Sequence, residues 1–160
     1  MDQRILDILM REGRLPAKDV AQRLDLDEKE TIDHIKELEK DRIILGYRAV
    51  VNPKNLGEDY VLSLIEVRVH PQRDVGFDAI AKRIYRFPEV KTCYLLSGTY
   101  DLLLIVEGRS VREVSAFVSE KLSTLENVAG TVTHFMLKKY KEDGFMMAEE
   151  EEPERLAITP

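Results

Sequence analysis

The stretch from Lys91 to Glu107 constrains the fold most, because two apolar runs flank a short polar segment. It reads KTCYLLSGTYDLLLIVE. The runs are rich in Tyr, Leu, Ile and Val, which favour strands. Gly98 has the backbone freedom that a tight turn needs, and the side chain of Asp101 can close such a turn with its own hydrogen bonds. We therefore expect a β-hairpin at the centre of a sheet, whose turn is either a plain connection or a ligand site.

The elements around this hairpin predict a βαββαβ order, the ferredoxin-like arrangement. Apolar spacing predicts strands and helices over 60–69 (strand), 76–87 (helix), 90–97 and 101–107 (the hairpin), 110–122 (helix) and 128–138 (strand). Two helices cover only one face of such a sheet, and the strands carry apolar residues on both faces. A second copy of the chain is the simplest cover for the other face, so we expect a homodimer.

The first fifty residues predict three short helices and a strand. Asp2 caps the first helix and Gly13 ends it, Pro16 opens the second, and Asp27 opens the third. We expect Ile43 and Ile44 to close the core and residues 47–51 to form a strand. A tight turn between the second and third helices is typical of a helix-turn-helix motif. The alternative is a generic three-helix domain that does not bind DNA.

The charge of the third helix argues against strong DNA binding. Residues 27–42 carry 7 acids and 4 bases, and carboxylates repel phosphates, although they accept hydrogen bonds from the cytosine amino group. Any single candidate contact has the alternative of a solvated surface charge. The candidates for contacts with double-stranded DNA are Arg14, Lys18, Lys29, Thr31, His34, Lys36 and Arg48.

The chain divides into an α+β two-domain arrangement with an acidic end. We expect a DNA-binding domain over 1–51, a linker over 52–59, a βαββαβ domain over 60–141 and an acidic tail over 142–160. The tail holds 1 base and 7 acids, while the net charge of the whole chain is −6. No apolar stretch has the length of a membrane span, and the first residues do not form a signal peptide, so we expect a cytoplasmic protein.

No catalytic or metal-binding set is evident in the sequence. The three histidines, His34, His70 and His134, have no second ligand at metal-binding spacing, and no nucleotide-binding glycine motif is present. The single cysteine, Cys93, lies in a strand without a neighbouring base, which favours an inert buried thiol. We therefore expect no metal, no cofactor and no enzyme activity.

The order of short motifs along the chain resembles the Lrp/AsnC, or feast/famine, family of transcription regulators. In the first half these are Ile5-Leu6-Asp7-Ile8-Leu9, Gly13-Arg14, Val20-Ala21-Gln22-Arg23-Leu24, and the run from Ile35 to Tyr47. In the second half they are Pro88-Glu89-Val90, the run from Cys93 to Asp101, and the alternating run from Thr131 to Lys141.

The resemblance implies a winged helix-turn-helix joined to an effector-binding domain. It implies dimers formed through the sheets, which assemble into tetramers or octamers, and a small effector, usually an amino acid. The matching turn is Gly98-Thr99-Tyr100-Asp101, where backbone N–H groups would hold a carboxylate and Asp101 an ammonium group. Ser97, Leu95 and Thr133 are expected near it.

Two alternatives stay open beside a DNA-binding regulator that responds to an effector. One is an effector-binding oligomer of the same family with weak or no DNA binding, because family members usually carry arginines on the third helix and this chain carries acids. The other is an enzyme similar to the sirohaem decarboxylases, whose hairpin has His and Tyr-Asn-Leu-Trp where this chain has Gly-Thr-Tyr-Asp and no tryptophan at all.

Overall fold

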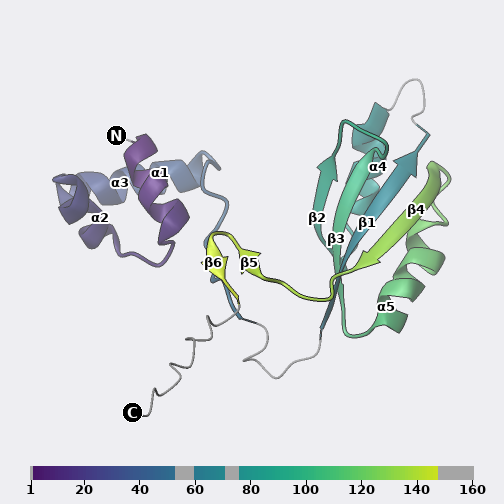
Figure 1. Cartoon of the computed structure of the whole chain (residues 1–160). Helices are drawn as coiled ribbons and strands as arrows, with labels where there is room; N and C mark the ends of the chain where they lie inside the picture. Colours follow the sequence, from purple (N-terminus) through teal and green to yellow (C-terminus); the bar gives the residue numbers. More distant parts are fainter. Residues whose placement is uncertain (1, 53–59, 71–75, 148–160) are drawn as a thin grey trace, which may run out of the picture. The chain divides into compact units, whose positions relative to one another are not determined.

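The computed structural model describes residues 2–52, 60–70 and 76–147 (Figure 1). The chain separates into two compact units, residues 1–51 and residues 52–160. The expected linker, apart from Asn52, and most of the expected acidic tail (148–160) lie outside the described residues. No helix in the described ranges is long and apolar enough to cross a membrane.

Unit 1 is a three-helix domain whose helices begin where the sequence predicts. They are α1 (Asp2–Arg11), α2 (Ala17–Leu24) and α3 (Glu28–Lys40). Extended Pro16 precedes α2, and Asp27 caps α3 by accepting a hydrogen bond from the Glu30 backbone N–H at 2.9 Å. The helices enclose a core of Ile5, Leu9, Val20 and Leu38.

The segment after α3 differs from the prediction. The backbone N–H groups of Ile43 and Ile44 both donate to the Leu38 carbonyl and end the helix, but Ile43 is 58% exposed and only Ile44 is half-buried. Residues 47–51 form no strand. A strand exists only through a paired neighbour, and the described part of the chain offers this segment none.

Unit 2 contains a four-stranded antiparallel sheet in the order β2-β3-β1-β4. Its strands are β1 (Val61–Val69), β2 (Val90–Leu95), β3 (Leu102–Gly108) and β4 (Val128–Phe135). Helix α4 (Gly76–Ile84) follows β1, and α5 (Val111–Ala116) continues into the π-helical η2 (Phe117–Leu122) before β4. This is the expected ferredoxin-like βαββαβ fold.

Alternate residues of the central strands bury their side chains under the helices. Ile65 and Val67 of β1 and Leu102, Leu104 and Val106 of β3 are fully buried, and they pack with the apolar faces of α4, α5 and η2. Figure 1 shows both helices on the same side of the sheet.

The intervening residues point to the opposite face, which we call the open face. No described helix or strand of unit 2 covers it. It carries Leu62, Leu64, Leu103 and Ile105, all half-buried, and Val132, which is 41% exposed. The register places Leu64 opposite Ile105, so the face is apolar at its centre.

A second, two-stranded sheet spans the expected boundary between the βαββαβ domain and the tail. Strands β5 (Lys141–Glu142) and β6 (Phe145–Met146) pair across Asp143 and Gly144, which both have positive φ angles, 46° and 90°. The side chain of Met147 is only 6% exposed. Ordered structure therefore continues to Met147, beyond residue 142, where we expected the acidic tail to begin.

Candidate effector and nucleic-acid interfaces

Asp101 ties the β2–β3 turn to the end of β1. Its backbone N–H donates to the Val67 carbonyl at 3.1 Å, and its carbonyl accepts from the Leu96 N–H at 2.8 Å. Its carboxylate Oδ2 accepts from the Val69 N–H at 2.8 Å. One carboxylate oxygen is thus already used inside the fold, which leaves Oδ1 as the oxygen available to a ligand.

Tyr100 is held on the open face by two residues of β1. The Glu66 carboxylate raises the pKa of Tyr100, as an acceptor for its hydroxyl and by its negative charge. The Arg68 guanidinium lies 5.9 Å from the ring centroid, a cation–π distance. Glu66 also lies 3.6 Å from His134 Nε2 on β4. The turn is therefore connected to the middle of the sheet by a polar cluster.

The tip of the turn presents backbone donors to solvent. Ser97, Gly98 and Thr99 are exposed, and in the described part of the chain no acceptor receives their N–H groups. A Cβ placed on Gly98 would meet no atom within 4 Å, and Gly98 does not have a positive φ. The expectation that the turn needs glycine for its backbone is wrong. The glycine instead leaves open space beside three unpaired donors.

The two outlying effector candidates have different positions. Leu95 pairs with Leu102 directly before the turn and is 59% exposed. Thr133 lies on β4 opposite Ile65, with β1 between it and β3. It therefore sits two strands, roughly 10 Å, from the hairpin and on the helix-covered face. Within one chain Thr133 therefore does not reach the turn, and its place in an effector site between neighbouring copies stays a prediction.

Two predicted DNA contacts on α3 are used inside unit 1. Thr31 is fully buried, and its hydroxyl donates to the Asp27 carbonyl at 2.8 Å. His34 is half-buried, with Nδ1 3.2 Å from Asp2 Oδ1 on α1. Thr31 is thus wrong as a DNA contact, because it holds the start of α3 in the core, and His34 packs toward α1.

The exposed face of α3 carries most of the basic residues of this helix. Residues spaced by four, seven and eleven positions lie on one face of a helix. We call this set of exposed side chains the α3 stripe: Lys29, Asp33, Lys36 and Lys40. Three lysines and one aspartate make it positive, although α3 as a whole is acidic.

The glutamates of α3 lie on its flanks, roughly 80–100° around the helix from the stripe. Glu30 and Glu37 are on one flank and Glu28 and Glu39 on the other, all exposed. Glu39 accepts a hydrogen bond from the Tyr47 hydroxyl at 3.0 Å. Partial burial, followed by this bond, raises the pKa of Tyr47. The acids that argued against DNA binding are therefore separated from the lysines.

The remaining DNA candidates lie outside α3. Arg14 is exposed in the turn before α2, Lys18 is exposed in the first turn of α2, and Arg48 is exposed in the extended segment after α3. All three stay candidates for phosphate contacts.

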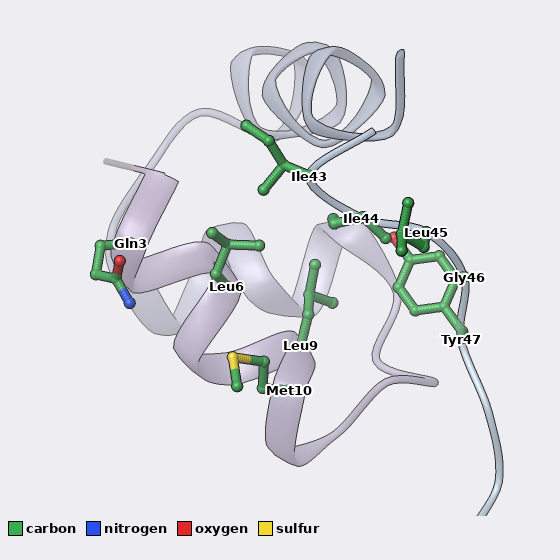
Figure 2. A pocket seen from close by; sticks show the side chains of 9 residues that line it. All are labelled: Gln3, Leu6, Leu9, Met10, Ile43, Ile44, Leu45, Gly46 and Tyr47. Atoms are coloured by element: carbon green, nitrogen blue, oxygen red, sulfur yellow. The ribbon is translucent and has the colours of Figure 1, made fainter. Parts of the chain in front are cut away.

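Unit 1 also contains an apolar groove of about 560 Å³ between α1 and the segment after α3. Figure 2 shows Leu6, Leu9 and Met10 on one side and the residues from Ile43 to Tyr47 on the other. Sequence reasoning missed this groove, because Ile43 was expected in the core. The residues that line the groove include no charged side chain, unlike the β2–β3 turn with Asp101.

No catalytic set appears among the described residues. They contain no group of three or more His, Cys, Asp or Glu side chains that could hold a metal ion. Burial raises the pKa of the Cys93 thiol, which lowers its reactivity.

The sequence did not point to Glu66, Arg68 or Lys40. Glu66 and Arg68 reach the turn only because β1 pairs with β3 in this register. Lys40 was identifiable, since it lies four residues after Lys36 on the same helical face.

Two family models match the chain, one for each half. Residues 1–44 match a winged helix-turn-helix DNA-binding model, and residues 62–145 match the Lrp/AsnC ligand-binding domain.

Relatives align over almost the whole chain. An HTH-type transcriptional regulator of Bacillus subtilis, YugG, is 41% identical over 98% of this chain and 95% of its own length. A proline dehydrogenase transcriptional activator of Rhizobium radiobacter is 30% identical over 89% of this chain and 91% of its own. The solved structure of a Neisseria meningitidis transcriptional regulator in complex with L-Met is 27% identical and covers 88% of this chain and 90% of its own, with a TM-score of 0.71.

Proposed function

Because this chain belongs to the Lrp/AsnC family of transcriptional regulators, we propose that it binds double-stranded DNA through α3 and an amino-acid effector at the β2–β3 turn. The observation that carries the proposal is the sorting of charge around α3. A helix that docks in the major groove turns its outer face to the base edges, and here that face bears the lysines.

In this proposal, unit 1 of a single chain binds DNA only weakly. The glutamates on both flanks of α3 face the phosphate walls of the groove and repel them. Phosphate attraction is left to Arg14, Lys18 and Arg48. An oligomer that engages several sites at once compensates through effective concentration.

The proposal of an effector site rests on the β2–β3 turn. Three unpaired N–H groups beside the open space at Gly98 suit a carboxylate. In the proposal, Oδ1 of Asp101 accepts from the ammonium group and the Tyr100 ring contacts the side chain of the effector. L-Met in the Neisseria complex supports an amino acid as the class of ligand.

Assembly rests on the open face. Its half-buried Leu62, Leu64, Leu103 and Ile105 lose contact with water when a second sheet packs against them. We therefore include a homodimer, further assembled to a tetramer or octamer, in the proposed function. Leu103→Lys places a charge at the centre of this face and is expected to give monomers in sedimentation velocity, whereas Arg109→Lys, on the exposed end after β3, leaves the assembly intact.

Fluorescence anisotropy with duplex DNA from upstream of the chain's own gene tests the DNA arm. We expect binding at 50 mM salt that weakens steeply at 200 mM. Absence of binding at 50 mM contradicts DNA regulation and favours the alternative, an effector-binding oligomer with weak or no DNA binding. The acidic flanks of α3 are the observation that favours this alternative.

A thermal-shift screen with the twenty amino acids tests the effector arm, since a ligand of the native state raises the melting temperature. Gly98→Leu fills the open space and is expected to abolish the shift, whereas Gly98→Ala adds a Cβ that meets nothing and keeps it. A Gly98→Leu protein that responds like the parent excludes the turn as the site.

A further inference from the structure

Only two exposed side chains in the N-terminal half of α3 lie on the outer face of the helix. The second helix of a helix-turn-helix contacts base edges with its N-terminal residues. In that half, Thr31 is buried, His34 packs toward α1 and Ile32 is half-buried. Lys29 and Asp33 remain, both exposed and both in the α3 stripe.

The spacing of Lys29 and Asp33 suits adjacent steps of a duplex. They are four residues apart, which is a rise of about 6 Å along the helix. Base pairs stack about 3.4 Å apart, so the two side chains cover one or two base-pair steps. The side chain of Asp33 is 62% exposed, and its nearest cation is Lys36 Nζ at 4.0 Å. That loose pair leaves the carboxylate able to turn to the groove.

The chemistry of this pair selects one kind of base pair. In the major groove, lysine donates to the O6 and N7 acceptors of guanine, and a carboxylate accepts from the N4 amino group of cytosine. Adenine is read by asparagine or glutamine, and α3, EKETIDHIKELEK, contains neither.

Position on the helix distinguishes Asp33 from the other acids. Glu28 and Glu30 lie on the flanks and face the phosphates, where a carboxylate only repels. Asp33 lies between Lys29 and Lys36 on the outer face, where a carboxylate meets base edges. A carboxylate at this place opposes binding unless it finds a donor, and cytosine supplies one.

We infer that α3 selects G·C base pairs in its half-site, with Lys29 bound to guanine and Asp33 accepting from the cytosine amino group. The inference rests on the proposed DNA binding and adds to it the identity of the bases and of the residues that read them. Lys36 and Lys40, further along the stripe, strengthen the contact without choosing a base.

Selection of binding sites from a random duplex library tests this with the full-length chain at 50 mM salt. The parent is expected to enrich adjacent G·C pairs in each half-site. Asp33→Asn replaces a reader of cytosine by a reader of adenine, so one enriched position is expected to change from C to A, about tenfold in relative enrichment. Lys29→Ala is expected to lose the preference for guanine at the neighbouring position.

Asp41→Asn is the matched control, because it removes the same charge at the C-terminal end of α3. It is expected to raise affinity for all sequences and to leave the motif unchanged. An Asp33→Asn motif identical to that of the parent overturns the inference, as does a parent motif without G·C pairs. A parent that binds no duplex overturns the proposed DNA binding as well, which separates the two failures.

Discussion

The α3 stripe and the β2–β3 turn are both exposed and polar, but they are attached to the fold in opposite ways. The lysines of the stripe are ends of long side chains on a helix whose other face is buried through Thr31 and Leu38. In the turn, the proposed effector residues themselves contact the sheet: Asp101 accepts a hydrogen bond from Val69, and Tyr100 interacts with Glu66. Substitutions in the stripe should therefore change binding alone, and substitutions in the turn should change binding and stability together.

Removal of the three lysines of the α3 stripe should have the largest effect. At about 1 kcal/mol for each charged contact, replacing all three by alanine weakens DNA binding on the order of a hundredfold. Exposed substitutions of this kind change stability by less than about 0.5 kcal/mol each. Anisotropy and urea unfolding measure the two quantities. The control replaces Lys82, Lys91 and Lys141 of unit 2, and an equal loss there would mean that charge alone, not its position, governs binding.

Replacement of Asp101 should have the second largest effect, which is a loss of folding stability. Asp101→Ala leaves the partly buried Val69 N–H without its acceptor, at a cost of roughly 1–3 kcal/mol. Hydrogen exchange followed by NMR should show loss of protection at the Val69 amide, and Asp101→Asn, which keeps an acceptor oxygen, should lose less. If Asp101→Ala retains full protection at Val69, the turn is attached as loosely as the stripe and the comparison fails.

Thr31→Val separates a structural role on α3 from a DNA contact. It removes the hydroxyl that donates to the Asp27 carbonyl and keeps the shape of the side chain, so the free energy of unfolding should fall by about 1 kcal/mol. DNA affinity, measured by anisotropy, should stay within about twofold. A large loss of DNA affinity at unchanged stability would mean that Thr31 contacts DNA after all.

The smallest expected effect is on the ionisation of two tyrosines, Tyr47 after the α3 stripe and Tyr100 in the β2–β3 turn. Tyr47 donates to Glu39, the hydroxyl of Tyr100 interacts with Glu66, and both tyrosines have raised pKa values. A raised folded pKa means that this contribution to stability is complete below the unfolded tyrosine pKa of about 10 and is lost as pH rises through the folded value. Absorbance titration should show late-ionising tyrosines, fewer in Tyr100→Phe than in the parent.

The sequence predicted the helices and strands that have a capping residue or a long run of periodic apolar positions. The caps Pro16 and Asp27 and the alternation of β1 fix helices and strands within a few residues. Residues 47–51 have the composition of a strand, but pairing is a tertiary property. The β5–β6 hairpin was missed because two-residue strands show no period, although Asp143-Gly144 is a hairpin signal.

The candidate site was predictable as a stretch of chain but not as an arrangement. The residues from Ser97 to Asp101 predicted a turn, and the resemblance to the Lrp/AsnC family added its expected effector role. Which oxygen of Asp101 is used, and that Glu66 reaches Tyr100, depend on strand register, which single residues do not encode. The position of Thr133 depends on register too, since a threonine in an alternating run does not reveal that β1 will separate it from the hairpin within one chain.

The hydrogen bond from Asn52 Nδ2 to the Met147 carbonyl, 3.2 Å long, joins the first residue of unit 2 to the end of the described chain. A unit whose described ends meet is suited to circular permutation and to insertion as a module into another protein. The boundaries for such a module are 52 and 147. A cut at 141 would remove the β5–β6 hairpin together with buried Met147, and would leave Asn52 without this acceptor.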